Sequence, residues 1–136
     1  RTSIIGPELK PNGIGLLHWF LNQRNKINGY TNVMWTGVST IYLAKFILNI
    51  LLENDITGVI HLTNNTKISK YEILNIFKIL FDRKKLVINK FDKIKIDKSI
   101  INTRIDFTYT VPPYDEMFFE MKEWILQNRN IYNYSL

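Results

Sequence analysis

The chain has 136 residues, enough for one compact domain, and its 18 basic and 12 acidic residues give a formal charge of +6. The absence of cysteine excludes a disulfide framework and a cysteine metal site. A hydrophobic fraction of 46% is typical of a globular protein with a core, and no apolar run is long enough to span a bilayer. We therefore expect a cytoplasmic protein with no membrane contact.

Much of the positive charge lies in one segment, where basic residues alternate with Ile, Val and Phe. Its members are Arg83, Lys84, Lys85, Lys90, Lys93, Lys95 and Lys98. This alternation is typical of a strand with one solvated face. A nucleic-acid site would need a contiguous basic patch with several exposed aromatic rings, and only Phe91 lies within the segment. We therefore expect no nucleic-acid partner.

The first third of the chain mixes short strands with one helix. Thr2–Ile5 is β-branched and apolar, and Gly6 and Pro7 end it. A helix is predicted over residues 14–23, a turn at Asn28 and Gly29, and a partly extended segment over residues 30–38. The first residues of the chain already have the pattern of a strand. We therefore expect the chain to be a piece of a longer protein.

A strong helix is predicted next, capped by Ser39 or Thr40 and continuing to about Asn54. Apolar residues recur in it at the spacing of one helix face, and this pattern predicts a wide buried stripe. The stripe consists of Leu43, Ala44, Ile47, Leu48, Leu51 and Leu52. A short buried strand over residues 59–63 should follow.

The second half begins with a capping box, in which Ser69 and Glu72 satisfy each other's backbone amides at a helix start. Strands are expected over residues 86–89 and around residues 94–96. The last helix is predicted over residues 114–128, with Trp124 among its inward residues, and residues 130–136 should fray. This order predicts an α/β fold of one domain over residues 1–136, with a small mixed sheet and about four helices.

The sequence contains no complete motif for cofactor binding, catalysis or metal binding. Gly13 and Gly15 give only half of a dinucleotide-binding loop and do not follow a strand directly. No tyrosine has a lysine four residues later, and His18 and His61 have no carboxylate cluster near them in the sequence. We therefore expect neither a catalytic residue nor a metal ligand in this chain.

Four segments, taken in order, resemble the C-terminal half of extended short-chain dehydrogenases/reductases, in particular the dTDP-4-dehydrorhamnose reductase and sugar-nucleotide epimerase group. They are Arg-Thr-Ser-Ile-Ile-Gly-Pro at 1–7, Trp-Thr-Gly-Val-Ser-Thr at 35–40 followed by Leu43 and Ala44, Gly-Val-Ile-His-Leu at 58–62, and Ile-Ser-Lys-Tyr-Glu-Ile at 68–73. The family commonly has an arginine where this chain has Trp35, and one more residue between the arginine and glycine of the first segment. The resemblance implies a substrate-binding portion of a Rossmann-like fold.

The resemblance also implies roles for particular residues. Thr2 and Ser3 would meet the nicotinamide of NAD or NADP, or would be plain strand residues. Pro7 and Asn102 would lie at the sugar-nucleotide site, and Trp35 would stack on a base or sugar or belong to the core. Arg104 would pair with a diphosphate or with Asp106. We expect Trp35 and Arg104 to share a cleft that faces the carboxyl end of the 2–5 strand.

The implied function is that of the substrate-binding part of an NAD(P)-dependent reductase or epimerase of a nucleotide-linked sugar. The cofactor would be held mainly by an N-terminal Rossmann part of the same protein, and a homodimer is one expected assembly. The alternative is a non-catalytic regulatory or binding subunit on the same fold. The two readings differ in whether a Tyr-Lys pair lies in the N-terminal part.

Overall fold

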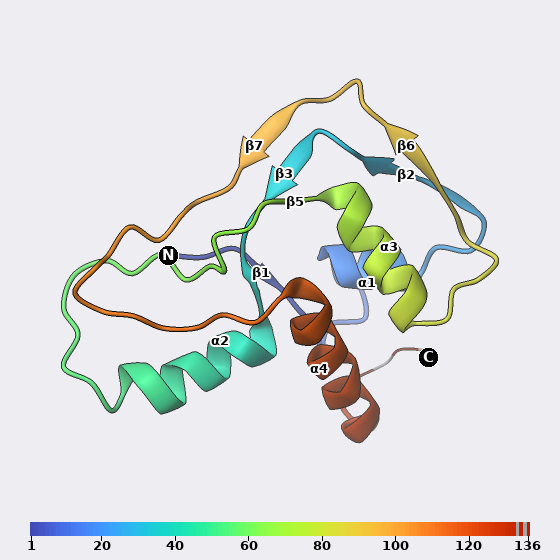
Figure 1. Ribbon diagram of the computed structural model, residues 1–136. Helices are drawn as coiled ribbons and strands as arrows, with labels where there is room; N and C mark the ends of the chain where they lie inside the picture. The colour runs from blue at the N-terminus through green and yellow to red at the C-terminus, as the bar shows by residue number, and fades with distance from the viewer. Residues whose placement is uncertain (133, 135) are drawn as a thin grey trace.

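The computed structural model describes residues 1–132, 134 and 136 (Figure 1). Its helices are α1 (Leu16–Leu21), α2 (Thr40–Phe46), which continues into a π-helical turn η1 (Ile47–Leu51), α3 (Lys70–Leu80) and α4 (Tyr114–Gln127). Its strands are β1 (Ile4–Ile5), β2 (Lys26–Tyr30), β3 (Val33–Trp35), β4 (Val38–Ser39), β5 (Ile68–Ser69), β6 (Val87–Phe91) and β7 (Ile96–Lys98). The predicted α/β class is confirmed.

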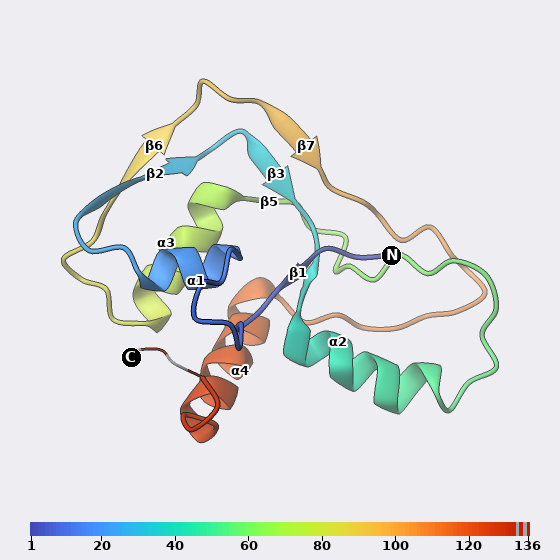
Figure 2. The ribbon, with the colours of Figure 1, turned by 180° about the vertical axis from the view of Figure 1, so that it is seen from behind.

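The strands form three small sheets. β1 pairs with β4 and β2 pairs with β6, both in parallel, while β3 lies between antiparallel β5 and parallel β7. In Figure 1 the β2–β6 and β5–β3–β7 sheets run along the top, with α1 and α3 beneath them, and Figure 2 shows α1 from behind. The sheets are therefore covered by helices on the side that carries the core.

The core is centred on aromatic side chains from three helices. Phe20 of α1, Phe77 of α3 and Phe118 of α4 are fully buried, with ring centroids 5.5 Å apart for Phe20 and Phe77 and 5.0 Å apart for Phe77 and Phe118. The capping box at Ser69 and Glu72 is confirmed and starts α3. Local capping and apolar periodicity thus set both the start and the buried face of this helix.

The predicted turn at Asn28 and Gly29 is wrong, because both residues lie inside β2, where they pair with Asn89 and Lys90. A Cβ on Gly29 would stand 2.7 Å from the Tyr71 ring and 2.9 Å from Ile88. The glycine therefore allows α3 to approach the strand closely, which is a packing role and not a turn.

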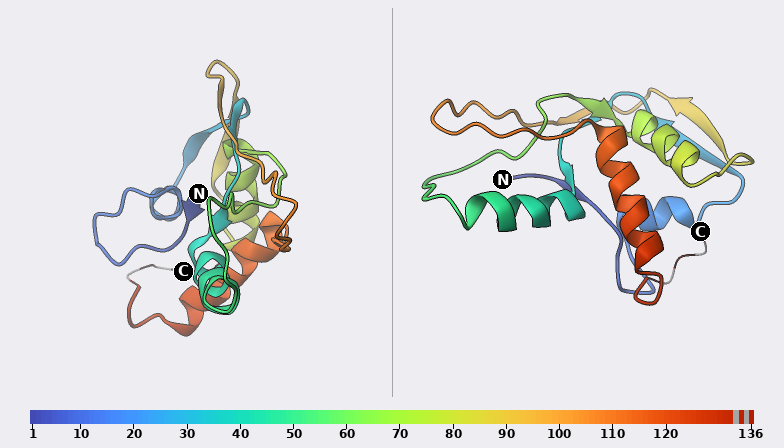
Figure 3. Two further views of the ribbon diagram at one scale, coloured as in Figure 1. Left: turned by 90° about the vertical axis from the view of Figure 1, so that its left-hand side faces the viewer. Right: turned by 60° about the horizontal axis from the view of Figure 1, so that its bottom comes forward.

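The predicted buried stripe over residues 43–52 is wrong in this chain. The α-helix ends at Phe46, the only buried residue of α2. Leu48 is 60% and Leu52 is 71% exposed, and Ile47 is also exposed. Figure 3 shows the α2–η1 helix projecting away from α1 and α3. The periodicity identified an apolar face correctly, but nothing among the described residues covers most of it.

Three smaller expectations also differ from the structure. Residues 59–63 form no assigned strand, although the Leu62 amide donates to the Arg1 carbonyl at 2.9 Å. The tail does not fray at Tyr134, whose hydroxyl accepts the Glu8 amide at 2.8 Å, while residues 133 and 135 lie outside the described residues. Trp124, expected to point inward, is 41% exposed.

Candidate functional site

Four of the site residues expected from the resemblance, Thr2, Ser3, Pro7 and Trp35, lie close to the short parallel pair β1–β4. Ile4 pairs with Val38 and Ile5 with Ser39, so the two strands end together. β4 runs directly into α2, and β1 runs into the Gly6–Pro7 turn. A Cβ on Gly6 would stand 2.0 Å from Thr40 Oγ1, so the turn lies tightly against the start of α2, with Pro7 half-buried.

Thr2 and Ser3 lie just before β1, and their polar groups are engaged within the chain. Thr2 Oγ1 donates to the Leu62 carbonyl at 2.8 Å. The Ser3 carbonyl accepts the Val38 amide at 3.0 Å. These bonds hold the segment between residues 60–62 on one side and β4 on the other, and both residues are half-buried.

The Trp35 indole and the Ser3 backbone both lie against Gly37. A Cβ on Gly37 would stand 2.2 Å from the Ser3 carbonyl oxygen and 2.3 Å from Cζ2 of the Trp35 indole. Trp35 is half-buried and packs on Tyr114, with ring centroids 5.7 Å apart. The indole therefore has one face on the core and reaches the backbone expected to contact the cofactor.

The expected position of Trp35 at the carboxyl end of β1 is wrong. Because β1 and β4 are parallel and Ile4 pairs with Val38, residues that precede Val38 lie beside residues that precede Ile4. Trp35 comes before Val38, and it lies next to Ser3. It is thus at the amino end of this strand pair.

Asn102 and Arg104 lie in one irregular segment that runs along residues 57–65. The backbone N–H of Asn102 donates to Asn65 Oδ1 at 2.7 Å. The side-chain Oδ1 of Asn102 accepts the backbone N–H of Arg104 at 3.2 Å. His61 Nδ1 lies 3.0 Å from the Ile101 carbonyl oxygen. The segment is joined to Trp35's neighbour as well, because the Ile100 amide donates to Thr36 Oγ1 at 2.8 Å.

The Arg104 guanidinium uses all three of its nitrogens within the chain. Nε and Nη2 donate to the two Asp106 carboxylate oxygens at 2.9 and 2.5 Å, and Nη1 donates to the Thr57 carbonyl at 2.8 Å. The hydrogen bond to Arg104 lowers the pKa of Asp106, and the same pair raises the pKa of Arg104. A diphosphate would have to compete with Asp106 for this planar fork.

Tyr114, which was predicted only as the first residue of the last helix, connects Trp35 to a cavity of about 520 Å³. Its hydroxyl donates to the Thr66 carbonyl at 2.7 Å, and its desolvation by burial raises the pKa to about 12. The other lining residues are Asn64, Thr66, Ile68, Ile76, Val111, Pro113 and Asp115. Only the position of Tyr114 directly after Pro112 and Pro113 marked it in the sequence, as a fixed helix start.

The described residues contain no group of three or more His, Cys, Asp or Glu side chains that could hold a metal ion. Within the same residues, no helix is both long and apolar enough to cross a membrane. What the site offers is a half-buried indole, backbone groups and a tyrosine-lined cavity. The indole and the cavity are linked through Tyr114, which packs on Trp35 and lines the cavity.

Comparison with known proteins gives matches among solved structures only: no protein-family model and no curated protein sequence matches the chain. A dTDP-4-dehydrorhamnose reductase from Bacillus anthracis str. Ames in complex with NADP has a TM-score of 0.66 at 12% identity, over 92% of this chain and 45% of that one. A GDP-L-fucose synthetase from Naegleria fowleri has a TM-score of 0.66 at 15% identity, over 94% and 44%.

A UDP-N-acetylglucosamine 4-epimerase from Methanobrevibacter ruminantium M1 in complex with UDP-N-acetylmuramic acid has a TM-score of 0.64 at 19% identity, over 93% of this chain and 44% of that one. The chain thus spans less than half the length of these enzymes. At such low identity the likeness defines the fold, and that fold agrees with the one predicted from the sequence. The chain has the fold of the C-terminal part of extended short-chain dehydrogenases/reductases that act on nucleotide-linked sugars.

Proposed function

We propose that this chain is the substrate-binding part of an NAD(P)-dependent reductase or epimerase that acts on a nucleotide-linked sugar, with a dTDP-4-dehydrorhamnose reductase-like activity as the leading candidate. The observation that carries the proposal is the fold shared over more than nine-tenths of the chain with a dTDP-4-dehydrorhamnose reductase and a UDP-N-acetylglucosamine 4-epimerase. Proteins of one fold can have different functions, which depend on the residues of the site. The residues near Gly37 must therefore also suit such a ligand.

The site residues support this proposal to different degrees. Trp35 offers an aromatic surface to a base or sugar ring beside Ser3, whose carbonyl already accepts the Val38 amide and the Thr2 hydroxyl. Pro7 follows Gly6, which lies against Thr40 at the start of α2, whereas Asn102 is held by Asn65 and, among the described residues, makes no hydrogen bond to either strand of the pair. Arg104 is the weakest member, because Asp106 and Thr57 already occupy its guanidinium.

The exposed face of α2 and η1 supports a further part of the proposal: an N-terminal Rossmann part of the same protein packs against it. Ile47, Leu48 and Leu52 are all exposed on the helical segment that continues from α2, and α2 itself packs beside a parallel sheet of only two strands. Additional parallel strands and their helices would bury such a face. That part would hold most of the NAD or NADP and supply the Tyr-Lys pair that this chain lacks. A homodimer and a cytoplasmic location belong to the same proposal.

The test is calorimetric titration of the complete protein and of residues 1–136 alone with NADH, NADPH and nucleotide-linked sugars. The complete protein should bind a reduced cofactor and a sugar nucleotide, whereas residues 1–136 should bind neither cofactor. Micromolar NADH or NADPH binding by residues 1–136 would overturn the division of roles. A complete protein that binds the sugar nucleotide but turns nothing over would identify the regulatory or binding subunit that is the alternative.

A further inference from the structure

A second cavity, of about 410 Å³, lies at the other end of the molecule from the Trp35 site and is lined mainly by basic residues. Its lining residues follow α1 and α3 directly in the chain, and the ends of these two helices lie to the right of the N-terminus in Figure 1. Its lining residues are Gln23, Arg24, Asp82, Arg83, Lys84, Lys85 and Leu86.

Strand register brings two of these cations together. β2 and β6 are parallel, with Lys26 paired to Val87, so the residues two places earlier, Arg24 and Lys85, fall at the same level of the two chains. The Val87 amide donates to the Asn25 carbonyl at 2.8 Å and extends the pairing toward them. The backbone pairing therefore brings Arg24 and Lys85 to neighbouring positions, just before the two strands begin.

The turn after α3 supplies the remaining charges in a fixed geometry. Asp82 takes a left-handed conformation with φ of 50°, which ends the helix, and the Arg83 amide donates to the Lys78 carbonyl at 3.0 Å. Arg83 Nη2 donates to the Leu21 carbonyl at 3.1 Å, which ties this turn to the end of α1. The guanidinium is thus oriented before any ligand arrives.

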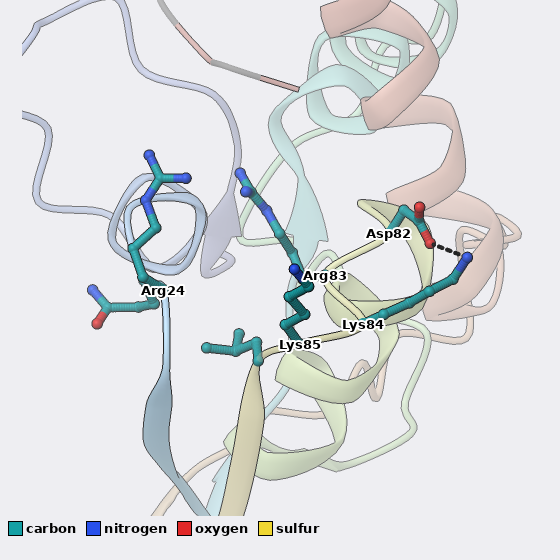
Figure 4. Close-up of a pocket in the computed structure, with 7 residues that line it drawn as sticks. Arg24, Asp82, Arg83, Lys84 and Lys85 are labelled. Atoms are coloured by element: carbon teal, nitrogen blue, oxygen red, sulfur yellow. Dashed lines mark ion pairs between the residues drawn. The ribbon is translucent and has the colours of Figure 1, made fainter.

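Charge balance at the cavity favours an anion. Asp82 is the one carboxylate among the described residues that line it, and it pairs with Lys84 at 3.2 Å. Figure 4 shows Lys84 turned toward Asp82, while Arg24 and Arg83 extend side by side in the same direction. The Arg24 guanidinium fork and the adjacent Lys85 ammonium match the oxygens of a phosphate group, and the Arg83 guanidinium, held by the Leu21 carbonyl, adds positive charge beside them.

We propose that this cavity is a binding site for a small phosphorylated ligand, recognised through its phosphate or diphosphate group by Arg24, Arg83 and Lys85. Its volume of about 410 Å³ accommodates a molecule of that size. The site lies away from Trp35 and does not depend on the proposed sugar-nucleotide function. A bound effector here would stabilise the junction of α1, α3 and the β2–β6 sheet.

The test is calorimetric titration of the complete protein with pyrophosphate, inorganic phosphate, a nucleoside diphosphate and the matching nucleoside, all at one ionic strength. Arg24→Gln and Lys85→Gln should each weaken pyrophosphate binding about tenfold, the usual effect of losing a charge-assisted hydrogen bond. Both side chains are exposed, so the variants should keep the wild-type melting temperature. Lys93→Gln, beyond the other end of β6, removes the same charge and should leave the affinity unchanged.

Comparable binding of pyrophosphate and the nucleoside diphosphate supports recognition through phosphate. The proposal is overturned if pyrophosphate shows no saturable binding, if Lys93→Gln weakens it as much as Arg24→Gln does, or if the nucleoside alone binds as tightly as its diphosphate. Tighter binding of single-stranded RNA than of pyrophosphate, lost in the same variants, would also overturn it in favour of a nucleic-acid surface.

Discussion

Gly37 lies so close to Ser3 that a Cβ at residue 37 would stand 2.2 Å from the Ser3 carbonyl oxygen. A side chain there must push apart β1 and β4 or displace the Trp35 indole, which lies on the same position. Gly37→Ala should therefore lower the free energy of unfolding by about 1–3 kcal/mol, the usual cost of overpacking. Urea denaturation measures it.

A control at a second glycine distinguishes the cost of crowding from the cost of an unfavourable backbone conformation. Gly58 has a positive φ of 81°, which favours glycine. A Cβ at this position would have open space, because the nearest atom is Arg104 Nη1 at 4.0 Å. Asn adopts this left-handed conformation more readily than most residues do, so Gly58→Asn should destabilise less than Gly37→Asn, which meets crowding. Equal effects of the two Asn variants would contradict the crowding at Gly37.

The second prediction compares two neighbours on the helix of residues 40–51. Phe46 is 3% exposed and packs in the core, so Phe46→Ala should cost about 3–5 kcal/mol of unfolding free energy. Leu48 is 60% exposed, so Leu48→Asp should change the stability of residues 1–136 by less than about 0.5 kcal/mol. Chemical denaturation of both variants decides whether the helix is placed correctly.

The same Leu48 variant tests the proposed covering of α2. In the complete protein, Leu48→Asp should lower the melting temperature clearly, because it would place an unpaired charge in an apolar interface. Wild-type melting of that variant in the complete protein would mean that the face stays open to solvent.

The third prediction concerns Tyr114 at alkaline pH. Burial raises its folded-state pKa from 10.0 to about 12. The folded protein therefore holds the phenol proton more tightly than the unfolded chain does, so this stability is fully present below pH 10 and is lost as pH rises toward about 12. Tyr114→Phe should reduce the loss of stability across that window, and tyrosinate absorbance should lose its latest-titrating component. An unaltered alkaline profile would show that Tyr114 is accessible to solvent.

The fourth prediction separates the two readings of Arg104 in the complete protein. If Arg104 serves a diphosphate, Arg104→Ala should weaken sugar-nucleotide binding about tenfold and spare NAD(P)H. Asp106→Asn, which frees the guanidinium, should then maintain or strengthen that binding. Calorimetry of both variants is the measurement. Wild-type affinity in Arg104→Ala assigns the residue to its ion pair with Asp106 alone.

Features set by neighbours in sequence could be predicted from the sequence. The capping box needs only Ser69 and Glu72, three residues apart, and α4 follows from its start after Pro113 and its apolar period. The turn at Asn28 and Gly29 was mispredicted because β6, some 60 residues later, pairs with them and keeps them extended. Local turn propensity is weak against a full parallel ladder.

The sequence indicates which residues belong to the candidate site but not how they are arranged in space. Periodicity shows that α2 has an apolar face, but it cannot show what covers Leu48. We expected Trp35 in a cleft at the carboxyl end of the 2–5 strand, and the structure puts it beside Ser3, at the amino end. The parallel register that decides between the two ends is a long-range property. Tyr114 was missed because its contact with Trp35 joins residues distant in sequence.

The most direct test of the account is photo-crosslinking of the complete protein with a photoreactive nucleotide-linked sugar, followed by peptide mapping. Labelled peptides should come from residues 1–7, 33–37 and 102–104, and the labelling should be abolished by excess unlabelled sugar nucleotide and reduced in Trp35→Ala. Label confined to peptides outside residues 1–136, or label that unlabelled sugar nucleotide does not displace, would contradict the claim that this chain binds the substrate.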